Sequence, residues 1–174
     1  IVEDDDGNFW AAGLYWREQP VAEYVHLKPP FVEEMMVKIS PAGEVLREIS
    51  ILDALYRSGY QGTIDSNKKK FDMTHMNDVE VLSAELADKF PSFNAGDIMV
   101  SLRNYNMVLV IDGETEQVKR HFRHPLIHQH DPDFETDGSM VIFDNNDDTT
   151  REGSLGGQTQ LLRVDPATGS YERI

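Results

Sequence analysis

Two histidines in this sequence stand in the same short motif, His-x-x-Asp. The first copy is His75-Met76-Asn77-Asp78 and the second is His130-Asp131-Pro132-Asp133. A neutral imidazole is a competent nitrogen nucleophile near pH 7, and it can also donate or relay a proton. Arg103, in Ser101-Leu102-Arg103-Asn104, carries a planar guanidinium that can hold an oxyanion through two hydrogen bonds. These residue types could support nucleophilic chemistry on an anionic group.

Each of these residues also has a structural explanation, and the sequence leaves both open. A histidine at a strand end can simply be hydrogen-bonded to its neighbours, and an arginine there can form a surface ion pair. Asn77 and Gln129 could donate to a substrate or could link neighbouring parts of the fold. Asp78 and Asp133 recur at the same place in both motifs, which favours a structural role in turns.

Two other groups of residues could bind a metal ion. His124, His128 and His130 alternate along the chain, and imidazoles that share one face of a strand suit zinc or copper. No clear further ligand follows at motif spacing, so no metal is predicted. The run Asp144-Asn145-Asn146-Asp147-Asp148 begins like a calcium loop, but Thr149 replaces the required Gly and Leu155 the bidentate Glu. An EF-hand is therefore excluded, and an irregular calcium loop stays open.

Strands dominate the elements that must position these side chains. Period-two alternation predicts strands over residues 9–15, 35–40, 45–51, 78–82, 98–102, 107–111, 117–122, 140–143, 161–164 and 170–174. The one good helix candidate covers residues 51–58, with Ser50 as its cap and Gly59 as its stop. Residues 62–72, which include Lys68-Lys69-Lys70, are predicted to form a loop with a solvated basic run.

Three predicted hairpins share one pattern of residues, at 37–45, 110–118 and 163–171. Each follows a strand that begins after a glycine, at Gly7, Gly96 and Gly138. The last two copies extend upstream to the His-x-x-Asp motifs. Four strands per repeat is typical of a β-propeller blade, with a β-sandwich as the alternative.

We therefore predict an all-β chain that forms part of a single β-propeller. Its three visible blades should cover about residues 1–60, 74–123 and 128–174, with a loop at 61–73 and one short inserted helix near 51–58. Three blades cannot close a ring, because a propeller needs about four to eight, so the sequence is expected to be about half of a longer protein. Since inner strands begin at the central channel, His75 and His130, at matching blade positions, could face one another across a shared pocket.

Charge and composition narrow the classes of partner. The 174 residues include 16 Lys and Arg against 31 Asp and Glu, which gives a net charge of −15. Such a surface repels phosphate backbones and anionic lipid, so neither nucleic-acid binding nor membrane docking is expected. No apolar run approaches the roughly 20 residues that a membrane-spanning helix needs. The absence of cysteine excludes disulfides, thiolate zinc sites and a cysteine nucleophile.

The motifs together resemble those of the bacterial arylsulfotransferase family. The residues that carry the resemblance are 74–82, 100–104, 129–134, Asp137-Gly138 and 141–145, and the likeness covers most of the chain after about residue 35. The family implies a six-bladed propeller, periplasmic or extracellular, that moves a sulfuryl group from a phenolic sulfate to another phenol. It implies a transiently sulfated histidine, no nucleotide donor and no cofactor. The expected partners are then a small aryl sulfate and a phenol.

Residue roles follow from the same resemblance. His130 matches the sulfated histidine, and His75 matches a second channel histidine that donates to a sulfuryl oxygen or relays a proton. Arg103 would hold the sulfate, and Asn77 and Gln129 would be substrate-binding donors. The chain departs from the family at Asn146, where a glycine usually follows Phe-Asp-Asn. The alternative is a non-catalytic, secreted or cell-surface propeller that binds a ligand or a protein in the same channel.

Overall fold

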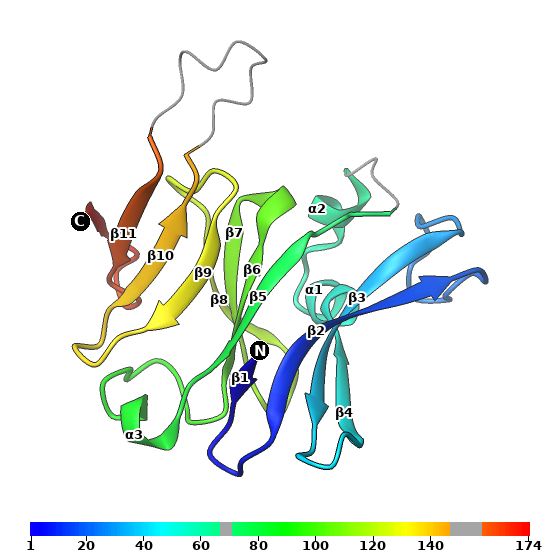
Figure 1. Ribbon diagram of the computed structural model, residues 1–174. Coiled ribbons are helices and arrows are strands. Elements are labelled where there is room, and N and C mark those ends of the chain that lie inside the picture. The colour runs from blue at the N-terminus through cyan, green and yellow to red at the C-terminus, as the bar shows by residue number, and fades with distance from the viewer. Residues whose placement is uncertain (67–70, 147–157) are drawn as a thin grey trace.

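The computed structural model describes residues 1–66, 71–146 and 158–174. Three four-stranded antiparallel sheets stand side by side, and the strands of each sheet follow one another in chain order (Figure 1). This is the arrangement of successive propeller blades, in which each blade is a four-stranded meander. The predicted fold class, an all-β partial propeller, is confirmed.

The twelve strands of the described chain form three blades of four strands each. Blade 1 contains β1 (Val2–Glu3), β2 (Phe9–Arg17), β3 (Phe31–Ile39) and β4 (Val45–Ser50). Blade 2 contains β5 (Met76–Val81), β6 (Ile98–Leu102), β7 (Met107–Ile111) and β8 (Val118–Phe122). Blade 3 contains β9 (His130–Phe134), β10 (Met140–Asp144), β11 (Gln160–Val164) and β12 (Tyr171–Arg173). The first strand of each blade is the innermost one, so β1, β5 and β9 lead toward the same axis.

Short helices fill the connections between strands. The predicted helix is confirmed as α1 (Ile51–Arg57), where the Ser50 hydroxyl accepts a hydrogen bond from the amide of Asp53 at 3.1 Å. Two helices were not predicted, α2 (Gln61–Asp65) and α3 (Ala84–Ala87). None of the helices in the described ranges is long and apolar enough to cross a membrane.

The predicted loop at residues 61–73 is therefore wrong for residues 61–65, which form α2. Gly62 and Thr63 are poor helix formers, but Ile64 in the same turn is fully buried in the core that includes α1. Burial of this side chain stabilises the turn where local propensity does not. Lys68-Lys69-Lys70 lies outside the described residues.

Two of the predicted hairpins have the same turn geometry. Between β7 and β8, Asp112 accepts the amides of Glu114 and Thr115 at 3.0 and 2.8 Å, and Glu116 is left-handed with φ 61°. Between β11 and β12, Asp165 accepts the two amides at the equivalent positions, and Gly169 takes the left-handed place with φ 75°. The repeated residues therefore encode a repeated turn, although one copy places a glutamate where glycine is favoured.

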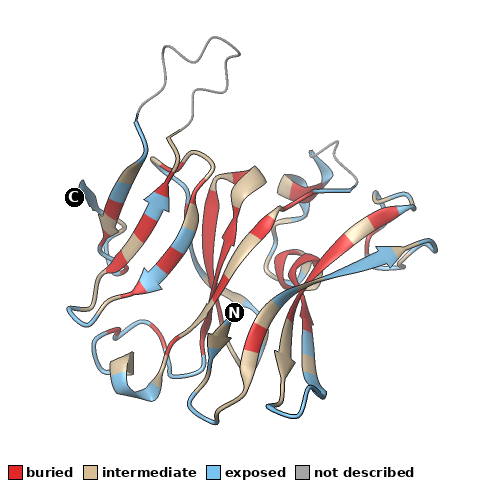
Figure 2. Cartoon of the chain, viewed as in Figure 1, coloured by how far each residue is buried: buried red, intermediate tan, exposed pale blue. Residues whose placement is uncertain are grey.

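The core lies in two layers between the blades. Every residue of β6 and β7 is buried, because both faces of blade 2 are covered by its neighbours (Figure 2). One hydrophobic cluster joins blade 1 and α1 to blade 2, and a second joins blade 2 to blade 3. In the second cluster Phe134 packs against Phe90 and Phe93, with ring centroids 5.0 and 6.2 Å apart. Packing between the blades therefore holds the end of the inner strand β9 against blade 2.

Candidate functional site

The structure places the two predicted histidine segments next to one another. His75 immediately precedes β5, and His130 is the first residue of β9. The side-chain amide of Asn77 donates to the backbone carbonyl of Gln129 at 3.0 Å, which joins the two segments directly. The backbone amide of Arg103 donates to the carbonyl of His75 at 3.2 Å, so Arg103 adjoins the first segment.

His75 has a partner that the sequence analysis missed. Its Nδ1 lies 2.8 and 2.9 Å from the two carboxylate oxygens of Asp72. An ionised carboxylate only accepts hydrogen bonds, so this contact assigns the donor role to Nδ1 and leaves Nε2 for other partners. A carboxylate that orients an imidazole in this way is typical of catalytic histidines. The signal for it was available, because Asp72 stands three residues before His75 in a short connection.

His130 is held within a bulged strand. It pairs with Phe143 across β9 and β10, and the two rings meet edge to face with centroids 6.5 Å apart. The next residue, Asp131, is left-handed with φ 49° and stands outside the regular pairing between His130 and Pro132. The bulge reorients the chain directly beside His130, as bulges next to functional sites commonly do.

The two histidines do not occupy matching blade positions, so that expectation is wrong. His130 pairs with Phe143, whose counterpart in blade 2 is Ser101, and Ser101 pairs with Asp78. The counterpart of His75 is instead His128: both are left-handed, with φ 50° and 53°. Each of the two strands has a bulge of one extra residue, but the bulge lies at Asn77 in β5 and at Asp131 in β9. The equal spacing of the two His-x-x-Asp motifs does not reveal this difference.

Gln129 lies in the interior of the blade 2–blade 3 interface. Its side chain is fully buried, and its Nε2 donates to the Ser101 hydroxyl at 3.0 Å and to the Met107 carbonyl at 2.9 Å. Its own carbonyl accepts from the Ser101 hydroxyl at 3.2 Å as well as from Asn77. In this structure the amide of Gln129 therefore links two blades, and substrate contact stays a prediction.

Gln129→Leu is expected to lower the free energy of unfolding by about 2 kcal/mol, because Ser101 and the Met107 carbonyl lose a buried donor. Chemical denaturation measures the change. The matched control is Gln61→Leu, since the amide of Gln61 also donates to a backbone carbonyl but is exposed. A Gln129→Leu protein as stable as the control would contradict the linking role.

Arg103 adjoins the turn of His75 through its backbone amide. It begins a single 3₁₀ turn (Arg103–Tyr105) and is half-buried. Within the described ranges, no carboxylate forms an ion pair with its guanidinium, whereas Arg47, Arg57 and Arg163 are all paired. A guanidinium can bind an oxyanion through two hydrogen bonds, and the binding of sulfate by Arg103 stays a prediction.

The metal-binding alternatives gain no support. His124 lies against Tyr171 of β12, with ring centroids 5.7 Å apart, so its ring contacts the outermost strand and not the segment of His130. No group of three potential ligands gathers within residues 1–66, 71–146 and 158–174. Asp144, at the start of the calcium-like run, is buried and accepts from the Ile127 amide at 2.7 Å. Residues 147 and onward in that run lie outside the described residues.

Carboxylates crowd the two inner strands beyond the histidines. Burial, together with the charges of Asp131 and Asp133, raises the pKa of Asp78 to about 6. Burial and the same neighbours raise the pKa of Glu80 to about 7. Repulsion between these groups is therefore strongest when all are ionised, at neutral and alkaline pH.

This crowding predicts a dependence of stability on pH. The folded-state pKa values of Asp78 and Glu80 lie above their ordinary values of 3.8 and 4.5, so the folded protein binds these protons more tightly. The resulting stabilisation is complete below about pH 4 and is lost as the pH rises through 6 and 7. The double variant Asp78→Asn, Glu80→Gln should raise Tm at pH 8 and flatten this slope in thermal denaturation, whereas Glu44→Gln on an exposed hairpin should do neither.

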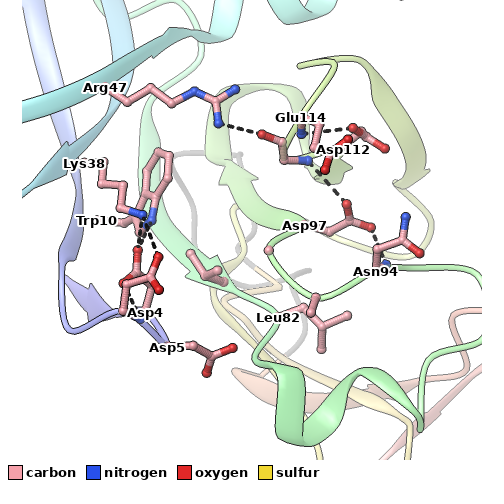
Figure 3. A pocket seen from close by; sticks show the side chains of 15 residues that line it. Asp4, Asp5, Trp10, Lys38, Arg47, Leu82, Asn94, Asp97, Asp112 and Glu114 are labelled. Atoms are coloured by element: carbon pink, nitrogen blue, oxygen red, sulfur yellow. Dashed lines mark hydrogen bonds and ion pairs between the residues drawn. The ribbon is translucent and has the colours of Figure 1, made fainter.

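A cavity of about 490 Å³ lies at the other end of β5, between blades 1 and 2 (Figure 3). Its basic residues are already engaged: Lys38 pairs with Asp4 at 2.7 Å, and Arg47 donates to the Gly113 carbonyl at 2.6 Å. Asp97, on the opposite wall, pairs with Lys119 at 2.8 Å. The cavity between the blades is lined by charged residues, and neither His75 nor His130 lines it.

Comparison with known proteins decides the family. A model of the arylsulfotransferase family matches residues 2–173, nearly the whole chain. The chain belongs to the arylsulfotransferase family. Membership supports an arylsulfotransferase-like activity in general and small-molecule substrates. No individual curated protein shows significant similarity to this arylsulfotransferase-family chain.

Proposed function

We propose that this protein transfers a sulfuryl group from a phenolic sulfate ester to a phenol through a sulfohistidine at His130. His75 and Arg103 bind the transferring group, and Asn77 supports the two histidine segments. The observation that carries the proposal is the joining of these segments, through Asn77 and Gln129, in a chain that matches the family from residue 2 to 173. The backbone amide of Arg103 donates to the carbonyl of His75, which supports Arg103 as the cation of this site.

The reaction has two displacement steps at sulfur. In the first, an imidazole nitrogen of His130 attacks the sulfur of the donor ester, a nitrogen–sulfur bond forms, and the bond from sulfur to the phenolic oxygen breaks. In the second, the oxygen of the acceptor phenol attacks the same sulfur and the nitrogen–sulfur bond breaks. A proton must reach the leaving phenolate in the first step and leave the acceptor phenol in the second.

His75 and Asp72 are suited to that proton transfer. With its Nδ1 bonded to Asp72, His75 has one nitrogen available to give up or take a proton. Arg103 and the protonated form of His75 supply positive charge to the sulfuryl oxygens, where negative charge is concentrated in the transition state. The chain carries a net charge of −15, which disfavours an anionic substrate. The positive charge of Arg103 and His75 offsets this repulsion at the site.

Trapping the intermediate tests the proposal. The full-length protein is mixed with an aryl sulfate in the absence of an acceptor, digested at neutral pH, and the peptides are analysed by mass spectrometry. We expect one sulfuryl group on His130 and its loss when a phenol is added. Sulfation of another residue, or release of phenol with no labelled peptide, would exclude His130 as the nucleophile. A protein that neither releases phenol nor becomes labelled would instead be a binding propeller.

The cellular location is part of the same proposal. A periplasmic or extracellular enzyme would meet phenolic sulfates from the surroundings, and a chain without cysteine needs no particular redox environment. Fractionation of cells that express the full-length protein measures the location, and recovery in the cytoplasm would contradict it.

A further inference from the structure

One buried carboxylate of blade 1 holds the turn that carries His75. Glu34, on β3, has only 7% of its surface exposed. Its Oε1 accepts the amide of Met76 at 2.8 Å, and its Oε2 accepts both the amide of Thr74 at 3.2 Å and the Thr74 hydroxyl. The residues on either side of His75 are thus bonded to the same side chain, 40 residues away in the sequence.

The backbone of His75 requires such support. Its φ of 50° is left-handed, a conformation that is strained for a residue other than glycine and persists only where the surroundings impose it. Blade 2 bonds the turn from the other side, through the amides of Arg103 and Asn104, which donate to the carbonyls of His75 and Thr74. Blade 2 bonds the carbonyls of the turn, and Glu34 of blade 1 bonds its amides, so that the two blades clamp the turn from both sides.

The same contacts also hold the residue that orients the imidazole of His75. Asp72, the partner of Nδ1, belongs to the segment that Glu34 holds, and Phe71 before it stacks on Trp16 of β2 with ring centroids 5.3 Å apart. Blade 1 therefore grips this segment at two places, through an aromatic stack and through a carboxylate. A shift of the backbone at Thr74 would move His75 relative to Asp72.

In the next blade, a neutral side chain bonds the equivalent turn. The equivalent residue, His128, has its amide bonded to the neutral side chain of Asn106 at 2.9 Å. A buried carboxylate is costlier than an amide, and burial raises the pKa of Glu34. The charge of Asp72 raises that pKa further and the charge of His75 lowers it, so Glu34 lies within electrostatic reach of both members of the pair.

We infer that Glu34 is a positioning residue for the sulfuryl transfer proposed above, acting through the backbone of His75 and through the pairing of His75 with Asp72. The inference rests on the proposed function for its effect on turnover. Its effect on the state of His75 is measurable without any turnover.

The test compares two isosteric changes on one strand, made in the full-length protein. Glu34→Gln replaces one acceptor oxygen with an NH₂ group that faces the backbone donors of the turn. Glu33→Gln is the matched control, because Glu33 is also buried but bonds Tyr24, Ser50 and Arg17 on the other side of β3. The first measurement is the rate at which diethyl pyrocarbonate modifies His75, read by mass spectrometry, with His26, which is 71% exposed, as internal reference.

We expect His75 in Glu34→Gln to react at least about threefold more slowly, since an imidazole loses nucleophilicity when its carboxylate partner is misplaced. We expect kcat for sulfuryl transfer to fall about 10- to 100-fold, with a smaller change in KM. Glu33→Gln should leave both unchanged even where its Tm is lowered. Thr74→Val, which removes only the hydroxyl bonded to Glu34, should shift both in the same direction by less.

Equal modification of His75 in Glu34→Gln, Glu33→Gln and the unaltered protein would overturn the inference. Should Glu34→Gln fail to fold, the same comparison made with Thr74→Val decides it. A protein without transferase activity would refute the proposed function, while the difference in His75 reactivity would still test Glu34.

Discussion

His130→Ala is expected to lower kcat/KM for transfer from an aryl sulfate by at least about 10³-fold, because the variant has no nitrogen to receive the sulfuryl group. The other groups at the site would still bind the donor, so donor affinity should change far less than turnover. Steady-state release of phenol, followed together with sulfation of an added acceptor, measures both quantities. The folded structure should persist, since His130 is only half-buried at the start of its strand.

His124→Ala supplies the matched control for this experiment. His124 belongs to the same connection between blades 2 and 3, but its ring lies against Tyr171 of the outermost strand. Its loss should leave kcat/KM within about twofold of the unaltered protein, as expected for a surface change away from the reacting groups. Comparable losses in the two variants, or activity retained by His130→Ala, would rule out His130 as the covalent nucleophile.

Phe134→Ala should produce the largest loss of stability, about 3 to 5 kcal/mol in the free energy of unfolding. Phe134 is 6% exposed at the end of β9 and packs against Phe90 and Phe93, which follow α3 in blade 2. Its removal leaves a cavity in the cluster that joins blades 2 and 3, and the fixed strands around it limit collapse.

Denaturant titration of the full-length protein measures this loss. Phe71→Ala is the control, because Phe71 is 56% exposed and gives up only its stacking on Trp16, worth about 1 kcal/mol. If the two variants lost equal stability, the aromatic cluster would not be a main support of the interface between blades. Since β9 also carries His130, a partial loss of transferase activity should accompany Phe134→Ala.

Local sequence patterns predicted the blades well, because strands and hairpin turns depend on neighbouring residues. The Asp112 and Asp165 turns have the same hydrogen bonds because each aspartate accepts amides two and three residues later, a contact that spacing alone specifies. The helix at 51–57 followed equally from its Ser50 cap. In contrast, α2 depends on burial of Ile64 in the core that includes α1, and no local pattern reports that.

The candidate site also has one part that the sequence predicted and another that depends on tertiary packing. The types and motifs of His75, His130, Arg103 and Asn77 were evident in the sequence, and the structure joins their segments through Asn77 and Gln129. The alignment of the two histidines was wrong, since a bulge adds one residue to a strand without any mark in the spacing of a motif. The buried setting of Gln129 likewise depends on Ser101 and Met107, which approach only when blades 2 and 3 pack.

The sequence by itself determined ten of the twelve strands in the described residues, the repeated turns and the family. All of these rest on residues close together in the chain or on the motifs as a set. Only the tertiary structure decided that Glu34 of blade 1 clamps the turn of His75, and that His75 corresponds to His128. The physical reason is that a carboxylate on one blade and an amide on the next are brought together by packing of whole sheets. No pattern of neighbouring residues records a contact across 40 positions.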